Sequence, residues 1–400
     1  MVKEFTSRQV KTSKLTLWQA ASAVGLPAAM WRLPNEKQVF LAISAKEKPL
    51  SAQFEAFKEQ SGFAISPFQN SDQTVFIEAD YFFAFNENQE TISTDGLILK
   101  LPRGTEFDLL TRAEASFQAQ KSQAVSIKSV YDESVFMAMV TEAVEAIKAG
   151  EMQKVVLSRT KEVTLSEDFE VVKAFEELCA AYPNAFISAV ALPHLNQVWM
   201  GASPEILVSQ NQAGIFRTMA LAGTQTAFDE NQHLMTPAEA SWKQKEIEEQ
   251  AYVSRYIIDC FKKIRLREFK EEGPKTVVAG NLMHLRTDFY VDTVAVNMPE
   301  LLEVMLLLLN PTSAVCGMPK APATDFILQT ERHQRSFYSG YLGPVNVNQQ
   351  THLFVNLRTM MLKNGIATLF AGCGITENSN PKREWQETEM KCQTMLKVLG

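Results

Sequence analysis

The sequence predicts an α+β fold, with one large domain spanning residues 1–400 in which helices pack on antiparallel β-sheets. Strand-like and helix-like runs both occur, but without the regular alternation of a doubly wound parallel sheet. Strand-like residues 185–192 and 197–200 are joined only through Pro193 and His194, as in an antiparallel pair. Four hundred residues are enough for one large domain or two ordinary ones, with a substantial core either way.

Composition narrows the possible functions. With 46% hydrophobic and 21% charged residues, the chain is ordinary for a soluble globular protein. Its net charge of −7 favours neither nucleic acid nor an anionic membrane surface as a partner. The leucine-rich run at residues 304–309 is far too short to span a bilayer. An anionic ligand would therefore have to be attracted by a local charge arrangement.

Cysteine usage and the N-terminus predict a cytoplasmic location. The five cysteines are dispersed, odd in number and without a C-x-x-C pair, which suits a reducing compartment. Residues 1–15 are polar and lack the apolar centre of a signal peptide.

Residues 1–125 are expected to be structural, because they carry no catalytic motif. Residues 15–24 form a short amphipathic segment, and the pattern predicts a strand over 38–44 and one or two buried strands over 75–85. Ser51 as a cap and Gly62 as a stop predict a helix over residues 52–60. Polar residues 116–129 are expected to form a loop or the edge of a subdomain.

Residues 130–400 carry the motifs. Apolar residues at helical spacing predict a helix over 133–148, ended by Gly150, and Pro381 suits the first turn of another helix. The further expected helices cover residues 168–181, 241–261 and 381–398; the further expected strands cover 155–163, 215–220, 276–279, 340–345, 352–362 and 366–370.

Two of these helices present paired carboxylates on one face. Glu246 and Glu249 are spaced i, i+3, as are Glu384 and Glu387, with Lys391 on the same face as the second pair. Glu387 and Lys391 alone could be a surface pair worth ~0.3–0.5 kcal/mol. Two such helices could instead meet around Mg²⁺, which prefers carboxylate oxygens and water. A di-iron carboxylate site would need Glu-x-x-His on two helices, and neither helix has the histidine.

Lys154 and Glu205 could form a base and an acid of opposite type. Lys154 begins the apolar run Lys154-Val155-Val156-Leu157, where it is either a snorkelling surface residue or a buried amine whose charged form is disfavoured. Glu205 follows Ser203 and Pro204 in a tight turn, where it is either exposed or directed inward.

Small-residue turns could cradle an anion through backbone amides. Glycines at 372 and 374 end the strand at 366–370, and Ala222, Gly223 and Thr224 follow another strand. A third small-residue turn, at 310–320, contains Ala314.

Cations and a phenol follow in the last third of the chain. Arg335 and Tyr338 precede one strand, and Arg358, among apolar neighbours, needs an anionic partner such as a substrate carboxylate. His284 is expected to be a core histidine with its hydrogen bonds satisfied, and a ligand-binding role is the alternative. Cys316 and Cys373 are expected to be small fillers, because neither has an obvious histidine partner.

Nine motifs in order resemble the chorismate-utilising enzymes, the family that includes isochorismate synthase, salicylate synthase, and the anthranilate and aminodeoxychorismate synthases. They cover residues 130–400. In chain order they are Lys154-Val155-Val156-Leu157-Ser158-Arg159, Gly201-Ala202-Ser203-Pro204-Glu205, Leu221-Ala222-Gly223-Thr224, Lys245-Glu246-x-x-Glu249, Pro311-Thr312-x-Ala314-x-x-Gly317, Arg335-x-x-Tyr338-x-Gly340, Arg358, Gly372-x-Gly374 and Glu384-x-x-Glu387-x-x-x-Lys391.

The resemblance is greatest to isochorismate synthase, because Lys154, Ala222 and Ala314 stand where the ammonia-using enzymes typically carry Gln, sometimes a nucleophilic Lys, and Thr. Gln250 departs from the histidine usual in the family, and Asn310 and Ser313 depart from residues common in isochorismate synthases. Salicylate synthase, which also eliminates pyruvate, is the alternative, followed by an ammonia-using synthase component. A non-catalytic chorismate-binding protein is the remaining possibility.

The resemblance also implies a mechanism and a ligand set. It implies two antiparallel sheets flanked by helices, chorismate as substrate, Mg²⁺ as cofactor and no glutamine amidotransferase subunit. Lys154 would be the base for water attacking C2, and Glu205 the acid for the leaving C4 hydroxyl. Glu249 and Glu387 would hold Mg²⁺, with Glu246 and Glu384 acting through water. The product would feed menaquinone or catecholate siderophore synthesis. The implied substrate-binding residues are Ala222, Gly223, Thr224, His284, Ala314, Tyr338, Arg358, Gly372, Gly374 and Lys391.

Overall fold

A computed structural model of the chain describes residues 13–86, 132–229, 233–279 and 282–399. The predicted loop at 116–129 lies outside these residues. No helix in the described ranges is long and apolar enough to cross a membrane.

Two nine-stranded sheets form the centre of the molecule, and every strand pair within them is antiparallel. The predicted fold class is confirmed. In spatial order the first sheet contains β14 (Gly317–Met318), β7 (Lys154–Thr164), β18 (Ile366–Ile375), β17 (Thr359–Lys363), β9 (Gln197–Ser203), β8 (Phe186–Leu192), β1 (Ala28–Arg32), β2 (Val39–Ile43) and β6 (Tyr81–Phe85). The second contains β12 (Lys270–Ala279), β13 (Leu282–Asp292), β11 (Ile215–Thr226), β10 (Ile206–Gln210), β16 (Thr351–Val355), β15 (Tyr341–Val345), β4 (Gly62–Ile65), β5 (Thr74–Glu78) and β3 (Leu50–Ala52).

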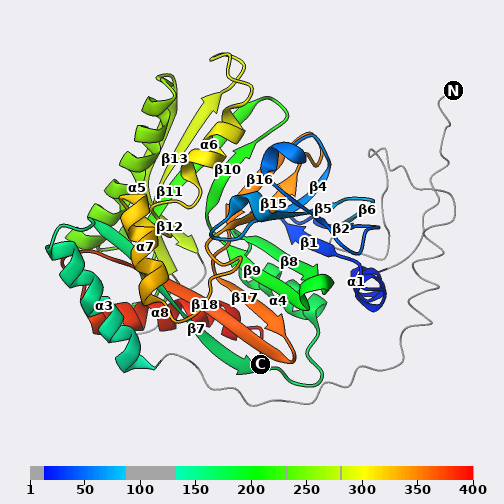
Figure 1. Cartoon of the computed structure of the whole chain (residues 1–400), viewed down its shortest axis with the longest axis horizontal. Helices are drawn as coiled ribbons and strands as arrows, with labels where there is room; N and C mark the ends of the chain where they lie inside the picture. Colours follow the sequence, from blue (N-terminus) through cyan, green and yellow to red (C-terminus); the bar gives the residue numbers. More distant parts are fainter. Residues whose placement is uncertain (1–12, 87–131, 230–232, 280–281, 400) are drawn as a thin grey trace.

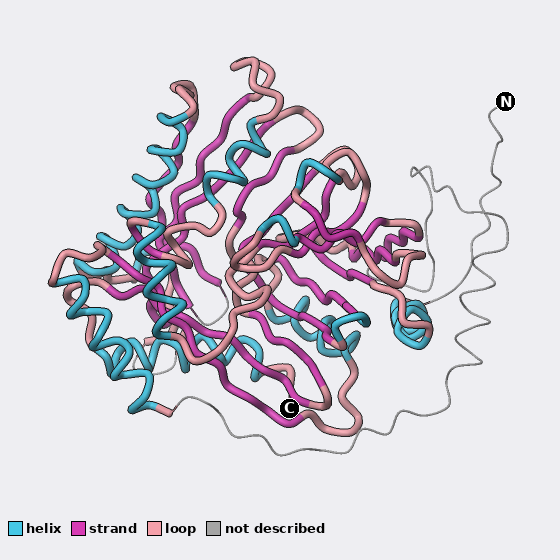
Figure 2. Tube along the Cα trace, in the orientation of Figure 1, coloured by secondary structure: helices cyan, strands magenta, loops and turns pink. Residues whose placement is uncertain are grey.

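Helices cover the outer faces of the two sheets, as Figures 1 and 2 show. On the first sheet, an apolar cluster joins α1, α4 and α8 to the strands, and a second cluster joins α3 and α7 to β7. On the second sheet, α5 packs on β11 and α6 on β10. The helices are α1 (Lys14–Ala23), α3 (Glu133–Lys148), α4 (Val171–Ala181), α5 (Gln244–Lys263), α6 (Leu301–Leu309), α7 (Lys320–Thr330) and α8 (Pro381–Leu396).

The inner faces of the two sheets share one aromatic-rich core. Trp31 and Trp199 of the first sheet and Phe63 of the second belong to it. Phe186 of β8 stacks on Phe354 of β16, with ring centroids 4.0 Å apart and planes 4° from parallel. The sheets therefore pack on each other directly, and strand ends from both can line one site.

Two element predictions are wrong. Residues 52–60 form only one 3₁₀ turn, Phe54–Ala56, because Ser51 is hydrogen-bonded into β3 opposite Val75 and does not cap a helix. Residues 352–362 are not one strand: the chain leaves β16 in the second sheet and enters β17 in the first. At the crossing Arg358 adopts a φ of 47°, an uncommon conformation for a residue other than glycine. Helices α6 and α7 and strands β1, β3, β4, β10, β13 and β14 were not predicted from the sequence.

Candidate active site

A cavity of ≈ 680 Å³, including space open to solvent, brings together most of the predicted site residues. Strands β7 and β18 contribute from the first sheet, β11 and β13 from the second, and α5 and α8 from the two outer layers. The predicted residues that line it are Lys154, Glu205, Ala222, Gly223, Thr224, Glu249, His284, Ala314, Tyr338, Arg358, Gly372, Gly374, Glu387 and Lys391. Glu246 and Glu384 do not line it.

Lys154 is a buried amine and not a snorkelling surface residue. It is the first residue of β7, pairs with Met318 of β14, and is 2% exposed. Burial lowers the pKa of Lys154, although the carboxylates of Glu249 and Glu205 oppose that shift. The neutral amine that a general base requires is therefore favoured by the position of this side chain.

Glu205 is a buried acid. It lies in the two-residue connection between β9 and β10 and is 3% exposed, so the inward alternative for this turn holds. Its backbone oxygen accepts a hydrogen bond from the nitrogen of Val355 (3.0 Å), which fixes the turn against β16. Burial raises the pKa of Glu205 to about 8, although Lys154, Lys391 and Arg358 each oppose the rise. The carboxyl is therefore protonated at neutral pH.

His284 positions Arg358. His284 Nδ1 lies 2.8 Å from the backbone oxygen of Gly223 and so donates to it, which leaves Nε2 to accept from Arg358 Nη2 at 3.0 Å. Burial, with the positive charge of Arg358, lowers the pKa of His284 to about 3 and keeps the ring neutral. His284 is therefore a buried histidine with both ring nitrogens hydrogen-bonded, as predicted, and it also holds Arg358 at the cavity.

The glycine strand end of β18 is held close to two polar side chains. Lys391 Nζ of α8 donates to the oxygen of Gly372 (2.8 Å) and to Glu387 Oε1 (2.7 Å). A Cβ added to Gly372 would lie 2.9 Å from the hydroxyl of Tyr338, whose pKa burial raises to about 12. The phenol therefore remains a hydrogen-bond donor at neutral pH.

Gly374 leaves room for Glu249. A Cβ at this position would lie 2.0 Å from Glu249 Oε1 and 3.1 Å from Cε of Lys154. The carboxylate of α5 thus reaches the base through the space that the missing side chain leaves.

The acidic helices α5 and α8 meet through buried carboxylates that are matched by lysines. Burial and the neighbouring Glu387 raise the pKa of Glu384 to about 7, against the attraction of Lys245. Burial also raises the pKa of Glu249, whereas Lys391 and Lys245 outweigh burial at Glu387 and lower its pKa. Lys245 and Lys391 thus offset part of the mutual repulsion among these carboxylates.

Lys245 is a residue of this cluster to which the sequence motif assigned no role. Its Nζ lies 2.5 Å from Glu384 Oε1. Burial disfavours the charge of Lys245, but the three surrounding carboxylates outweigh burial and raise its pKa. Its position next to Glu246 and four residues before Glu249, which places it on the same helix face, was the available signal.

One buried carboxylate oxygen in this cluster is free to bind a divalent cation, but the carboxylates are not arranged as a complete set of metal ligands. Glu384 Oε2 is buried without a hydrogen-bond partner, and hard oxygen donors are the ligands Mg²⁺ prefers. Within the described ranges, however, no group of three or more His, Cys, Asp or Glu side chains stands ready to hold a metal ion. Glu246 instead accepts from the backbone nitrogen of Lys243 at the start of α5 (3.0 Å). The magnesium site stays a prediction.

Arg335 is a structural clamp outside the cavity. Its guanidinium donates to the backbone oxygens of Val156 (2.7 Å) and Val315 (2.8 Å) and pairs with Glu331. It thereby fixes two backbone segments that line the cavity. Cys316 and Cys373 are buried thiols with raised pKa, as fillers should be.

Both the sequence and the fold are similar to those of known proteins. The family model for chorismate binding enzymes matches residues 39–400. Isochorismate synthase EntC of Escherichia coli (strain K12) is 28% identical over 288 residues, which are 71% of this chain and 71% of that protein. Isochorismate synthase MenF of Bacillus subtilis (strain 168) is 24% identical over 356 residues, which are 85% of this chain and 74% of that protein.

Solved structures share the fold. MenF, the menaquinone-specific isochorismate synthase from Escherichia coli, superposes with a TM-score of 0.73 at 20% identity, covering 97% of this chain and 92% of that one. Anthranilate synthase component I from Streptococcus pneumoniae TIGR4 gives 0.65 at 19%, covering 99% and 93%. The chain belongs to the chorismate-binding enzyme family. Within it, the protein is an enzyme close to the isochorismate synthases, which are isomerases.

Proposed function

We propose that the protein is an isochorismate synthase, which adds water at C2 of chorismate and releases the C4 hydroxyl. The observation that carries this proposal is the pair formed by Lys154 and Glu205. Both side chains are buried in one cavity, and burial moves the pKa of each toward its neutral form. A neutral amine and a protonated carboxyl are the base and the acid that this exchange requires.

The two groups divide the chemistry between them. Water is a weak nucleophile, so Lys154 takes a proton from it as the C2–O bond forms. The ring double bonds shift, the C4–O bond breaks, and Glu205 supplies the proton that lets the hydroxyl leave as water. The proton gained by Lys154 and the one lost by Glu205 balance, so the net change is an isomerisation. Each group is expected to contribute roughly 10²–10⁴ in rate.

Other residues of the cavity support binding of the substrate carboxylates. Arg358 is held by His284, so its guanidinium needs little reorganisation to meet a carboxylate. Tyr338 and Gly372 lie next to each other in the cavity lining, and the phenol of Tyr338 offers a hydrogen-bond donor. Lys391 adds an ammonium that also neutralises Glu387. We assign the enolpyruvyl carboxylate to Arg358, Tyr338 and Gly372.

Magnesium belongs to this proposal. Glu249 and Glu387 would hold the ion directly, with Glu246 and Glu384 through water. When bound, Mg²⁺ would offset the charge of the ring carboxylate and polarise it. The unpartnered Glu384 Oε2 supports the assignment, as do the neighbouring carboxylates of Glu249 and Glu387, which each raise the pKa of Glu384.

The cavity also favours an isomerase over an ammonia-using synthase. Ala222 and Ala314 line it where those relatives carry other residues, so no amidotransferase partner is proposed. A salicylate synthase would contain the same base and acid, so only the reaction products distinguish it from an isochorismate synthase. Whether the product feeds menaquinone or catecholate siderophore synthesis depends on neighbouring enzymes.

The test is a product assay with chorismate and Mg²⁺, with products resolved by chromatography, run with and without a chelator. We expect isochorismate in the absence of ammonia, and loss of turnover with the chelator. The Lys154→Ala variant should still bind chorismate and lose about 10²–10⁴ in kcat.

Three outcomes contradict the proposal. Salicylate and pyruvate without an added lyase would indicate a salicylate synthase. An amine product that requires ammonia would indicate a synthase component. Full activity of Lys154→Ala would remove the assigned base.

A further inference from the structure

A second cavity, lined by residues from both sheets, adjoins the active-site cavity and shares lining residues with it. It has ≈ 1680 Å³ of space, including that open to solvent, against ≈ 680 Å³ for the first. Pro204, Leu221 and Arg358 line both cavities. Arg358, the proposed carboxylate-binding residue, therefore stands at the boundary between them.

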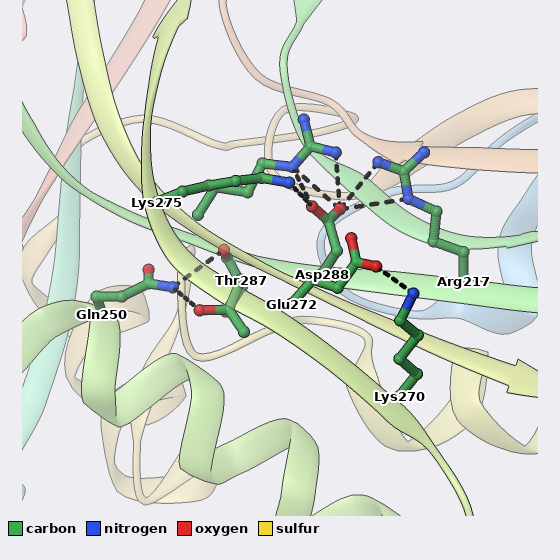
Figure 3. A network of polar contacts seen from close by, with 9 residues as sticks. Arg217, Gln250, Lys270, Glu272, Lys275, Thr287 and Asp288 are labelled. Carbon is green, nitrogen blue, oxygen red and sulfur yellow. Dashed lines mark hydrogen bonds and ion pairs between the residues drawn. The ribbon is translucent and has the colours of Figure 1, made fainter. Parts of the chain in front are cut away.

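One wall of this outer cavity carries a cluster of cations around a single buried carboxylate. Asp288, which is 0% exposed, accepts from Arg217 Nη2 (2.9 Å) and from Arg286 Nη2 (2.7 Å) and lies 3.3 Å from Lys275 Nζ. Figure 3 shows Arg217 and Lys275 approaching Asp288 from opposite sides. Nearby Glu272 is already paired with Lys270 at 2.5 Å.

The cluster keeps an excess of positive charge. Three cations face one carboxylate, which leaves two positive charges, and the Lys270–Glu272 pair adds none. In the described residues, no hydrogen bond engages Nη1 of Arg217 or of Arg286. Glu36, an acidic residue that lines this cavity, does not cancel the excess.

A buried carboxylate does not require this many cations. One bidentate arginine satisfies an aspartate, and Arg286 alone already does so through Nε and Nη2. Arg217 and Lys275 therefore exceed what the stability of Asp288 demands. Arg217, which lines the cavity, is available to an anion there, and Lys275 adds positive charge behind the wall.

The cationic wall leads toward the active site along β13. Alternate residues of a strand lie on one face, about 7 Å apart, so Asp288, Arg286 and His284 form a row. Arg286 is paired in register with Leu221, which lines both cavities. His284, the next in the row, holds Arg358 in the inner cavity. Successive donors thus run from Arg217 through Arg286 to Arg358.

We propose that the outer cavity is the entrance vestibule of the active site, in which Arg217 and Arg286 capture a carboxylate of the substrate before Arg358 receives it. This inference rests on the proposed ring dicarboxylate substrate. The chain as a whole carries a charge of −7 and repels such a dianion, so its attraction must be local. The vestibule supplies that local field where it opens into the catalytic cavity.

The test compares Arg217→Gln and Arg286→Gln with the wild type at low and high ionic strength. At about 20 mM salt we expect kcat/KM for chorismate to fall about five- to tenfold, because charge steering of this kind changes association by ten-fold or more. At about 500 mM salt the difference should shrink, because screening shortens the reach of the charges. The loss should lie in KM, and chorismate binding measured by calorimetry should weaken with the same salt dependence.

Three further variants separate charge from structure. Arg217→Lys keeps the charge and should restore most of the loss. Asp288→Asn removes the negative charge and should raise kcat/KM at low salt, whereas a structural role predicts a fall. Lys262→Gln, which removes an exposed charge on α5, is the matched control and should leave kcat/KM unchanged.

The vestibule is refuted by a loss that is equal at both salt concentrations, by a loss in kcat alone, or by no loss. If the wild type makes no isochorismate but the variants bind chorismate more weakly in the salt-dependent manner, the proposed function fails and the vestibule stands. If the wild type makes isochorismate and the variants have the same kcat/KM as the wild type, the proposed function stands and the vestibule fails.

Discussion

Burial favours the neutral forms of Lys154 and Glu205. An ionised pair in the same place would neutralise itself, but taking two ions out of water costs several kcal/mol for each ion. Burial is accordingly the largest influence on the pKa of both groups and acts toward the neutral form of each. On the surface, a lysine would be protonated and a glutamate ionised at neutral pH, so neither would be in the form that its catalytic role requires.

The pH dependence of turnover follows from Glu205. Because its pKa is about 8, the acid is present below that pH and lost above it, so kcat/KM should decline as pH rises through about 8. A pH–rate profile between about pH 6 and pH 10 measures this. A profile flat through pH 9 would contradict the acid assignment.

Stability provides an independent check on the same group. The folded-state pKa of about 8 exceeds the ordinary value of 4.5, so the folded chain binds more protons between these limits and becomes less stable as pH rises through them. Glu205→Gln cannot ionise, so it should gain in Tm relative to the wild type from about pH 5 to pH 9, while losing turnover.

At the scale of elements, the contact of β18 with α5 depends on one missing side chain. Gly374→Ala would drive a methyl group into Glu249 Oε1, beside Lys154. Displacement by about 1 Å can cost about 10² in rate, so kcat should fall by that order while the fold is kept. Steady-state kinetics with a thermal melt measure both effects.

Gly150→Ala is the matched control for that variant. Gly150 has a φ of +83° with open space around it, so alanine there should cost about 1 kcal/mol of stability and leave kcat/KM unchanged. Equal kinetics for Gly374→Ala and the wild type would contradict the close approach of Glu249.

At the scale of the whole molecule, the two sheets share an apolar layer, so we expect them to unfold together. Phe186→Ala removes a ring that is fully buried against Phe354 of the other sheet and should cost about 3–5 kcal/mol. Denaturant unfolding followed by tryptophan fluorescence and by far-UV circular dichroism should give one coincident transition.

Leu307→Ala serves as the control, because that side chain is 60% exposed and its removal should change the free energy of unfolding by less than about 0.5 kcal/mol. Two separated transitions in the wild type would contradict the single domain expected for residues 1–400.

Local sequence patterns were enough to predict many of the strands and helix faces. Apolar runs located most strands of the catalytic part, and the spacing of Glu384, Glu387 and Lys391 placed them on one helix face. Most of the residues in the sequence motifs line one cavity. Periodicity failed at residues 52–60 and 352–362, where pairing with a distant strand overrides a local preference.

The sequence by itself determined the fold class, the family and the residue types that meet in the cavity, because spacing along the chain encodes faces of helices and strands. Only the tertiary structure decided that Lys154 is buried beside Glu249, that Lys245 pairs with Glu384, and that Arg217 and Arg286 face a cavity open to Arg358. The physical reason is that burial and charge environment depend on segments far apart in the chain, which meet through sheet pairing and crossovers.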